Sequence, residues 1–194
     1  MPKITAGTVA EHREMQRATL VRLAEEILTE DGYDSLTFGV LAERADLSRP
    51  SVYSYFKSKD DILLAVCEAV LPRFFRRIDR AMALARSPQA QLVAFVRAQL
   101  QAAADGEHVI AQAVDRVPLS SETLARIGEL HERFAPNIVA VIAMLGHRHP
   151  ELIGQLVQGV VNAGVARIDA GEPARRVIRA ATDLVLKGVG ETSS

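Results

Sequence analysis

The most suggestive chemistry in this sequence lies in a polar set between residues 49 and 55. The outward face of this segment holds Arg49, Ser51, Tyr53, Ser54 and Tyr55. Val52 and Phe56 are spaced four residues apart and point inward, as they do in a helix. Arginine can bind guanine O6 and N7 together, whereas serine and tyrosine hydroxyls mainly bind phosphates. A short helix with this face suits the major groove of DNA, although the pattern leaves an inward ring open for Tyr55.

Residues 37–60 must position that face, and they predict two short helices joined by a tight turn, with a third helix behind them. Thr37 is a helix start signal, Ser48 caps the second helix, and Ser58 caps the third. Lys59 lies in the first turn of the third helix, where a cation opposes the helix dipole. An anion nearby would explain Lys59, and phosphate is the obvious one.

A longer pattern surrounds these residues. It consists of Leu41-Ala42, Ala45, Leu47-Ser48, Val52-Tyr53, Tyr55-Phe56 and Ser58-Lys59-Asp60. This run resembles the DNA-binding half of TetR-type transcriptional regulators, and the resemblance extends over residues 15–66. Asp46 departs from the glycine usual there, but Asp tolerates a left-handed turn better than most residues. Pro50 also replaces a frequent glycine, which argues against a close backbone contact with DNA at that position.

The resemblance assigns roles to individual positions. It implies phosphate contacts by Thr37, Ser51, Tyr53 and Lys59, and it places Ser48 and Ser54 close to base edges. With Arg49 these residues form the predicted DNA-binding set. The resemblance also implies a homodimer and a cavity for a small-molecule effector.

Composition and charge limit the class of protein. The chain has 194 residues, 48% of them hydrophobic, and a net charge of −1. A local charge of +3 over residues 44–59 fits a protein that docks one element on DNA rather than one that coats it. The single cysteine, Cys67, excludes an internal disulfide. The longest apolar run, residues 138–145, is too short to span a bilayer, so we expect a cytoplasmic protein with no membrane partner.

Helical periodicity continues along the rest of the chain, so the expected fold class is all-α. Helices are predicted over residues 11–31, 59–84, 88–104, 107–116, 121–146, 150–169 and 173–188. Pro72 predicts a kink or break in the second of these, and Pro136 predicts a bend in the fifth. Residues 1–10 are expected to form a mobile arm. We expect a helix-turn-helix domain over residues 1–60 and an effector-binding and dimerisation domain over residues 61–194.

The last two helices are apolar over a wide arc, so one face must cover their own core and another must cover a partner. We interpret them as a dimer interface in which two copies form a four-helix bundle. The interface residues expected are Ile153, Val157, Val161, Gly164, Val165, Ile168, Ile178, Ala181 and Val185.

Polar residues among apolar ones mark a candidate ligand pocket. His131 lies in an apolar seam, where it is either a core histidine or a group that orients a ligand. The pocket set expected is Phe95, Gln99, Gln112, His131, Phe134 and Asn162. The alternating His147, His149 and Glu151 converge poorly on a metal, so no metal or cofactor is expected.

No catalytic constellation is evident, and we do not expect an enzyme. The preferred interpretation is a dimeric regulator, by default a repressor, that a small molecule releases from a palindromic operator. Two alternatives stay open. One is a helical enzyme or interaction scaffold that merely retains the helix-turn-helix fold, and the other is a DNA-binding dimer without an effector.

Overall fold

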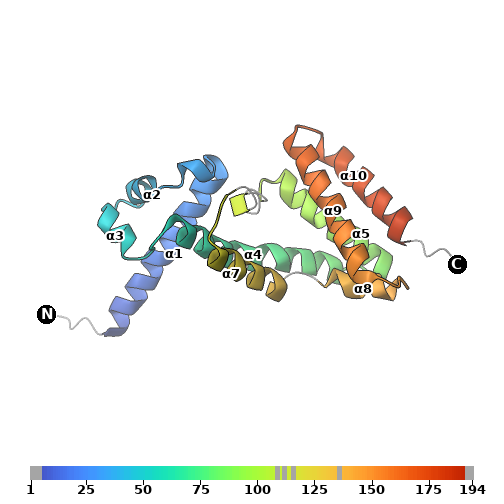
Figure 1. The fold of residues 1–194 in the computed structure, drawn as a ribbon, viewed down its shortest axis with the longest axis horizontal. Helices are drawn as coiled ribbons and strands as arrows, with labels where there is room; N and C mark the ends of the chain where they lie inside the picture. The colour runs from blue at the N-terminus through green and yellow to red at the C-terminus, as the bar shows by residue number, and fades with distance from the viewer. Residues whose placement is uncertain (1–5, 108–109, 111–112, 115–116, 135–136, 191–194) are drawn as a thin grey trace. The chain divides into compact units, whose positions relative to one another are not determined.

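A computed structural model describes residues 6–107, 110, 113–114, 117–134 and 137–190. These residues form helices and connecting turns without a strand, which confirms the all-α fold class (Figure 1). The helices are α1 (Ala6–Glu30), α2 (Phe38–Arg44), α3 (Arg49–Tyr53), α4 (Lys59–Ala83), α5 (Pro88–Ala104), α7 (Ser121–Phe134), α8 (Ile138–Met144), α9 (Pro150–Asp169) and α10 (Ala174–Val185). A short 3-10 turn, η1 (Tyr33–Ser35), follows α1, and a π-helical turn, η2 (Leu186–Gly190), follows α10.

The chain divides into two compact units. The first lies within Met1–Leu71 and Val109–Glu132, and the second lies within Pro72–His108 and Arg133–Ser194. The first unit therefore contains α1, α2, α3, the beginning of α4 and most of α7. The second contains the end of α4, α5, α8, α9 and α10.

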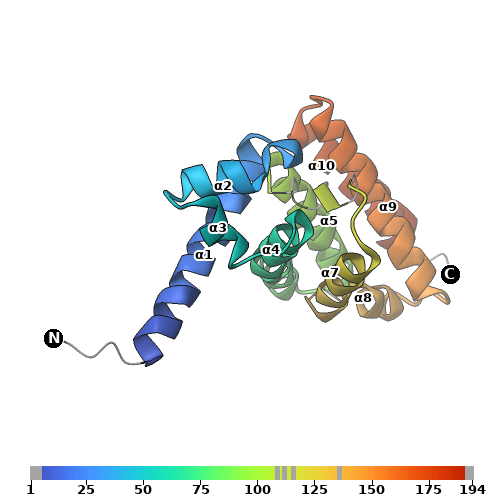
Figure 2. The same ribbon diagram turned by 60° about the vertical axis from the view of Figure 1, so that its left-hand side comes forward.

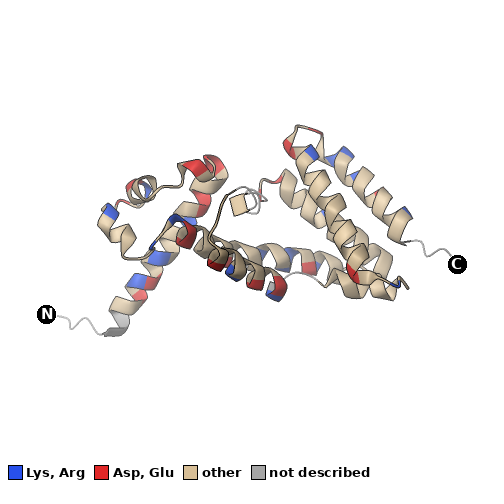
Figure 3. Cartoon of the chain, viewed as in Figure 1, with Lys and Arg blue, Asp and Glu red and all other residues tan. Residues whose placement is uncertain are grey.

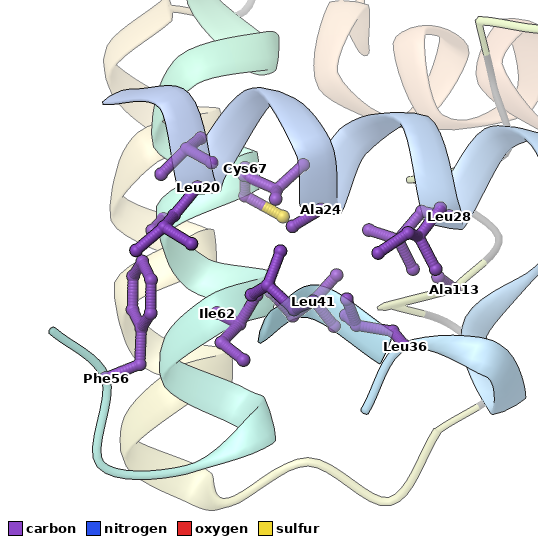
Figure 4. Packing of buried hydrophobic residues seen from close by; sticks show 14 of the residues in the cluster. Leu20, Ala24, Leu28, Leu36, Leu41, Phe56, Ile62, Cys67 and Ala113 are labelled. Carbon is purple, nitrogen blue, oxygen red and sulfur yellow. The ribbon is translucent and has the colours of Figure 1, made fainter. Parts of the chain in front are cut away.

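The first unit is organised around one apolar core (Figure 4). The stripe of α1, including Leu20, Ala24 and Leu28, is fully buried and belongs to the same cluster as Leu41 and Phe56. The first helix therefore packs on the helix-turn-helix. Burial of apolar side chains at this density is the main stabilising term for such a small unit.

Local signals set the ends of the short helices as expected. Thr37 Oγ1 accepts a hydrogen bond from the amide of Val40, and Ser48 Oγ accepts one from the amide of Ser51. Each bond satisfies an amide that the first turn of a helix leaves unpaired. Asp46 adopts a φ of 52° in the turn between α2 and α3. The aspartate thus takes the left-handed conformation for which a glycine would be usual.

In the second unit α9 and α10 lie side by side, and both contact α5 (Figure 2). Gly164 allows a close approach on α9, because a Cβ there would come within 2.6 Å of Leu100 Cδ2. Val157 and Val161 lie on the same buried face of α9. Gly164 therefore serves the packing of its own unit.

Several expected boundaries were wrong. The first helix begins at Ala6, so residues 6–10 are helical and not part of an arm. α4 continues through Pro72 without a break. The long helix expected over 121–146 is instead two helices, because α7 ends at Phe134 and Asn137 caps the start of α8. Most of the short helix expected over 107–116 lies outside the described residues.

Candidate nucleic-acid interface

α3 has one buried side and one exposed side. Val52 is fully buried, and Phe56 just after the helix is 2% exposed, so these two side chains anchor the segment to the core. Arg49, Tyr53 and Ser54 are exposed on the other side, with Tyr53 at 55%. The predicted inward face is therefore present, whereas two residues predicted on the outward face, Ser51 and Tyr55, are half-buried.

The serines of α3 bond to the helix itself. Ser48 Oγ and Ser51 Oγ lie 2.8 Å apart and share a hydrogen bond. Ser54 Oγ donates to the carbonyl of Ser51 at 2.7 Å. A hydroxyl that only accepts keeps its proton for a phosphate or a base edge, whereas Ser54, which donates its proton, can still accept a bond from a donor on a base edge.

Tyr53 is held by an aromatic partner. Its ring stacks on that of Phe38, with 4.0 Å between the ring centroids and 6° between the ring planes. Phe38 is the first residue of α2, so this stack ties the two short helices together. The pairing orients an exposed phenol before any ligand binds.

Thr37 and Lys59 lie at the starts of α2 and α4. Thr37 accepts a cap bond through Oγ1, which leaves its hydroxyl proton available for a phosphate oxygen. Lys59 Nζ lies 3.7 Å from the centroid of the Tyr33 ring. Partial burial there lowers the pKa of Lys59 and raises that of Tyr33. The local explanation for Lys59 is thus a cation–π contact, which the sequence did not suggest.

The positively charged face holds fewer available cations than its number of Lys and Arg residues suggests. Arg44 pairs with Glu30 at 2.9 Å and with Asp31 at 2.6 Å, and its hydrogen bond to Glu30 raises the pKa of the guanidinium. Lys and Arg alternate with Asp and Glu along α1 and α7 (Figure 3). Arg49 remains an exposed cation, and its guanidinium lies beside Gly39, where an added Cβ would come within 2.6 Å of Nη2.

Two arginines of α1 also belong to this site, although the sequence pattern did not predict them. Arg13 Nη2 donates to the carbonyl of Ser54 at 2.9 Å. Arg17 lies over the ring of Phe56, 5.7 Å from its centroid. Their spacing of four residues places them on one side of α1. That spacing was the available signal, but it does not reveal which residues they contact.

The expected dimer residues fall into two groups. Val157, Val161 and Val185 are buried within their own unit, as are Gly164 and Ala181, although the last two also line a groove on its surface. Half-buried positions are Ile153, Val165, Ile168 and Ile178. The exposed apolar side chains of α9 and α10 are instead Leu152, Leu156 and Leu184.

A surface groove lies beside one of these leucines, Leu184. It has a volume of about 310 Å³ and is lined by residues of α9 and α10 that include Val160, Ala163, Val177, Ala180 and Leu184. Arg167 and Glu172 border it and form an ion pair at 3.1 Å. The face is apolar in the middle and charged at its edge, which is the usual pattern of a protein interface.

The expected pocket residues are only partly brought together. Gln99 is buried on α5, and its Oε1 accepts a bond at 3.3 Å from Gln158 Nε2, which also donates to Asn162 at 3.0 Å. Gln99 Nε2 is buried and has no partner among the described residues. Phe95 is also buried on α5. His131 is exposed in the first unit, while Gln112 and the side chain of Phe134 lie outside the described part of the chain.

Within the described ranges, no three His, Cys, Asp or Glu side chains gather as a metal site would require. His147 Nε2 lies 2.7 Å from the carbonyl of Val189, so a backbone contact occupies that ring nitrogen. None of the described helices has both the length and the apolar character needed to cross a bilayer.

Comparison with known proteins bears on the same residues. The sequence pattern of the bacterial regulatory proteins of the tetR family matches residues 20–66. The class C tetracycline repressor of Escherichia coli is 40% identical over 57 residues, which are 29% of this chain and 26% of the repressor. Transcriptional regulator AcuR of Cereibacter sphaeroides is 36% identical over 80 residues, 41% of this chain and 36% of that protein. The matches thus span roughly a quarter to a third of these relatives' length.

Solved structures extend the likeness to the rest of the fold. A putative transcriptional regulator from Saccharomonospora viridis in complex with choline has a TM-score of 0.77 at 15% identity, over 89% of this chain and 96% of that one. The transcriptional regulator FadR from Bacillus subtilis in complex with stearoyl-CoA has a TM-score of 0.69 at 18% identity, over 91% and 99% of the two chains. These TM-scores establish a shared fold. The likeness to the tetR family of bacterial regulatory proteins therefore lies in the helix-turn-helix of residues 20–66.

Proposed function

We propose that the chain is a DNA-binding transcriptional regulator whose α3 enters the major groove of an operator. The observation that carries this proposal is the two-sided character of α3, which buries Val52 and exposes Arg49, Tyr53 and Ser54. A five-residue helix stabilises a core poorly, so an exposed polar face that is held rigidly by its neighbours indicates recognition.

The proposed roles follow from the side-chain chemistry. Arg49 reads a guanine edge, and Ser48 and Ser54 lie close to base edges. Phosphate contacts come from Thr37, Ser51 and Tyr53, whose hydroxyls can each bond an oxygen. Lys59 contributes through the field of its charge, because its ammonium group already lies on the Tyr33 ring.

The second unit supplies a partner surface in this proposal. Two copies join through the exposed leucines of α9 and α10, with Ile153, Val165, Ile168 and Ile178 at the edges. A dimer presents two copies of α3 to a palindromic operator, about one helical turn (~34–36 Å) apart. Repression is the proposed output, because the tetracycline repressors are among the matching relatives.

The buried amide of Gln99 supports an effector in the second unit. Flipping all three amides of Gln99, Gln158 and Asn162 together preserves their mutual bonds but leaves Gln99 Oε1 unpaired instead of Nε2. An unpaired buried polar atom costs on the order of 1–3 kcal/mol, so a polar group from a ligand or water would stabilise it. Structures of the same fold hold choline and stearoyl-CoA, which supports a small molecule of some kind. Phe95 and Asn162 complete the described part of this proposed pocket.

The test is fluorescence anisotropy on DNA from upstream of the chain's own gene, across a salt series. We expect tight binding that falls steeply with salt, because phosphate contacts release counterions. Arg49→Ala should weaken binding by roughly 1–3 kcal/mol, the range for one bidentate base contact. Arg175→Ala is the matched control, since it removes an exposed arginine from α10.

The outcomes separate the alternatives. If no upstream fragment is preferred over random DNA and a genome-wide selection returns no palindrome, the regulator proposal fails and a scaffold or enzyme becomes the better interpretation. If DNA binds tightly but no compound of a broad panel either releases it or raises the melting temperature, the protein is a DNA-binding dimer without an effector.

A further inference from the structure

Two arginines of α1, one turn apart, contact the residues that follow α3. Arg13 donates from Nη2 to the carbonyl of Ser54 at 2.9 Å, and its guanidinium carbon lies 5.2 Å from the centroid of the Tyr55 ring. Arg17 lies over the ring of Phe56 and pairs with Glu68 at 3.8 Å. Successive turns of α1 therefore contact three consecutive residues, 54–56.

The hydrogen bond from Arg13 is made at the C-terminal end of α3. Ser54 is the C-cap of α3, and the last carbonyls of a helix have no partner within the helix. A cation at this end also interacts favourably with the helix dipole. Because a five-residue helix is too short to be stable alone, contacts from neighbouring elements must fix its direction.

The contacts of Arg13 also explain why a cation occupies this position. Its guanidinium faces an aromatic ring and donates to a carbonyl, and both are favourable environments for a cation. Arg22, two turns further along α1, differs in that it pairs with Glu26 of its own helix. The sequence does not distinguish these two arginines, but their contacts do.

We propose that Arg13 is a positioning residue for α3, which fixes the direction in which Arg49 and Tyr53 meet DNA without itself binding a phosphate. This inference rests on the proposed function. Without Arg13, α3 samples more orientations in the free protein. The apparent affinity for DNA is then the intrinsic affinity multiplied by the fraction of molecules in which α3 is correctly oriented.

The first test compares Arg13→Ala with Arg22→Ala in the full-length protein, by anisotropy across a salt series. Arg13→Ala should weaken operator binding about tenfold at every salt concentration, the factor expected for one charge-assisted hydrogen bond. Arg22→Ala should leave binding unchanged, although it removes the same charge from the same helix. Melting temperatures confirm that both variants are folded.

The dependence on salt separates positioning from direct binding. If Arg13 bound a phosphate, Arg13→Ala would reduce the slope of log affinity against log salt by about 0.9, whereas a positioning role leaves the slope unchanged. A reduced slope would overturn the proposal, and so would an unchanged affinity.

The second test needs no DNA. In NMR spectra of the free protein, Arg13→Ala should shift the amide resonances of Ser54 and Tyr55, and Arg22→Ala should not. Arg13→Lys keeps a cation and a donor, so it should recover part of the shift and part of the affinity. If the wild-type protein binds no DNA, the proposed function fails and the positioning role with it. If the wild type binds DNA but the resonances do not move, only the inference about Arg13 fails.

Discussion

The hydroxyl groups around α3 are already engaged in the free protein. Ser48 and Ser51 share a hydrogen bond, and Ser54 bonds the carbonyl of Ser51. The capping role of Ser48 could be predicted from the sequence, because a cap depends on residues three apart. The stack of Tyr53 on Phe38 could not, because it depends on how two helices meet.

That stack makes Tyr53→Phe more informative than Tyr53→Ala. The phenylalanine keeps the ring on Phe38 but loses the hydroxyl, so DNA binding should weaken by about 0.5–1.5 kcal/mol, the contribution of one hydrogen bond, while the melting temperature stays constant. Tyr53→Ala should also lower the melting temperature, because it removes the aromatic pair. Anisotropy and thermal denaturation of both variants test this. Equal binding by Tyr53→Phe and the wild type would show that the hydroxyl does not contact DNA.

Cys67 gives a prediction about pH. Burial raises the pKa of its thiol to about 12, so the folded protein keeps this proton after the unfolded chain has lost it. The free energy of unfolding should therefore fall as pH rises from about 9 towards 12, by up to roughly 1.4 kcal/mol per pH unit. Urea denaturation at several alkaline pH values measures this slope. Cys67→Ala should show a weaker slope, and identical slopes would contradict the assignment.

At the scale of elements, the sequence was informative wherever a local signal marked an end. Thr37 and Ser48 each cap the helix that their position predicted, and Ser87 caps α5 in the same way. Pro72 is an exception, because α4 continues through it without the break that was one of the two predicted outcomes. Packing from neighbouring elements can outweigh a local preference, and the sequence does not show where it will.

The caps of α3 and α5 allow a matched comparison. Ser48→Ala and Ser87→Ala each remove one cap bond, so each should lower the free energy of unfolding by about 1 kcal/mol. Only Ser48→Ala should also weaken DNA binding, because it frays the helix that reads the DNA. Urea denaturation and anisotropy give the two quantities. An equal loss of DNA binding in both variants would argue against a special role for α3.

At the scale of the whole molecule, the partner surface proposed from the structure differs most from the one expected from the sequence. The apolar arc of α9 predicted one face on the chain's own core and another on a partner, but sequence alone could not tell which face meets the core. Val157 and Val161 lie on the inner face, and Leu152 and Leu156 lie on the outer one. The choice depends on α5 and α10, whose placement against α9 is a tertiary property.

A charge on the outer face should therefore disrupt the proposed dimer. Leu156→Glu should convert the protein to monomers, because a buried carboxylate without a partner is strongly unfavourable. DNA binding should fall with it, since one α3 alone lacks the second half-site. Sedimentation analysis and anisotropy report the two effects. Leu84→Glu is the control, because Leu84 is 85% exposed and lies outside α9 and α10.

The burial of Cys67 should also limit the rate at which a reagent modifies its thiol. The chain has no other cysteine, and this one is 1% exposed in the core beneath the helix-turn-helix. A thiol reagent can reach it only when that core opens. If reclosing is faster than the reaction, the labelling rate equals the rate for a free thiol multiplied by the open fraction. The labelling rate of Cys67 thus reports how often this core opens, and bound DNA should lower that rate.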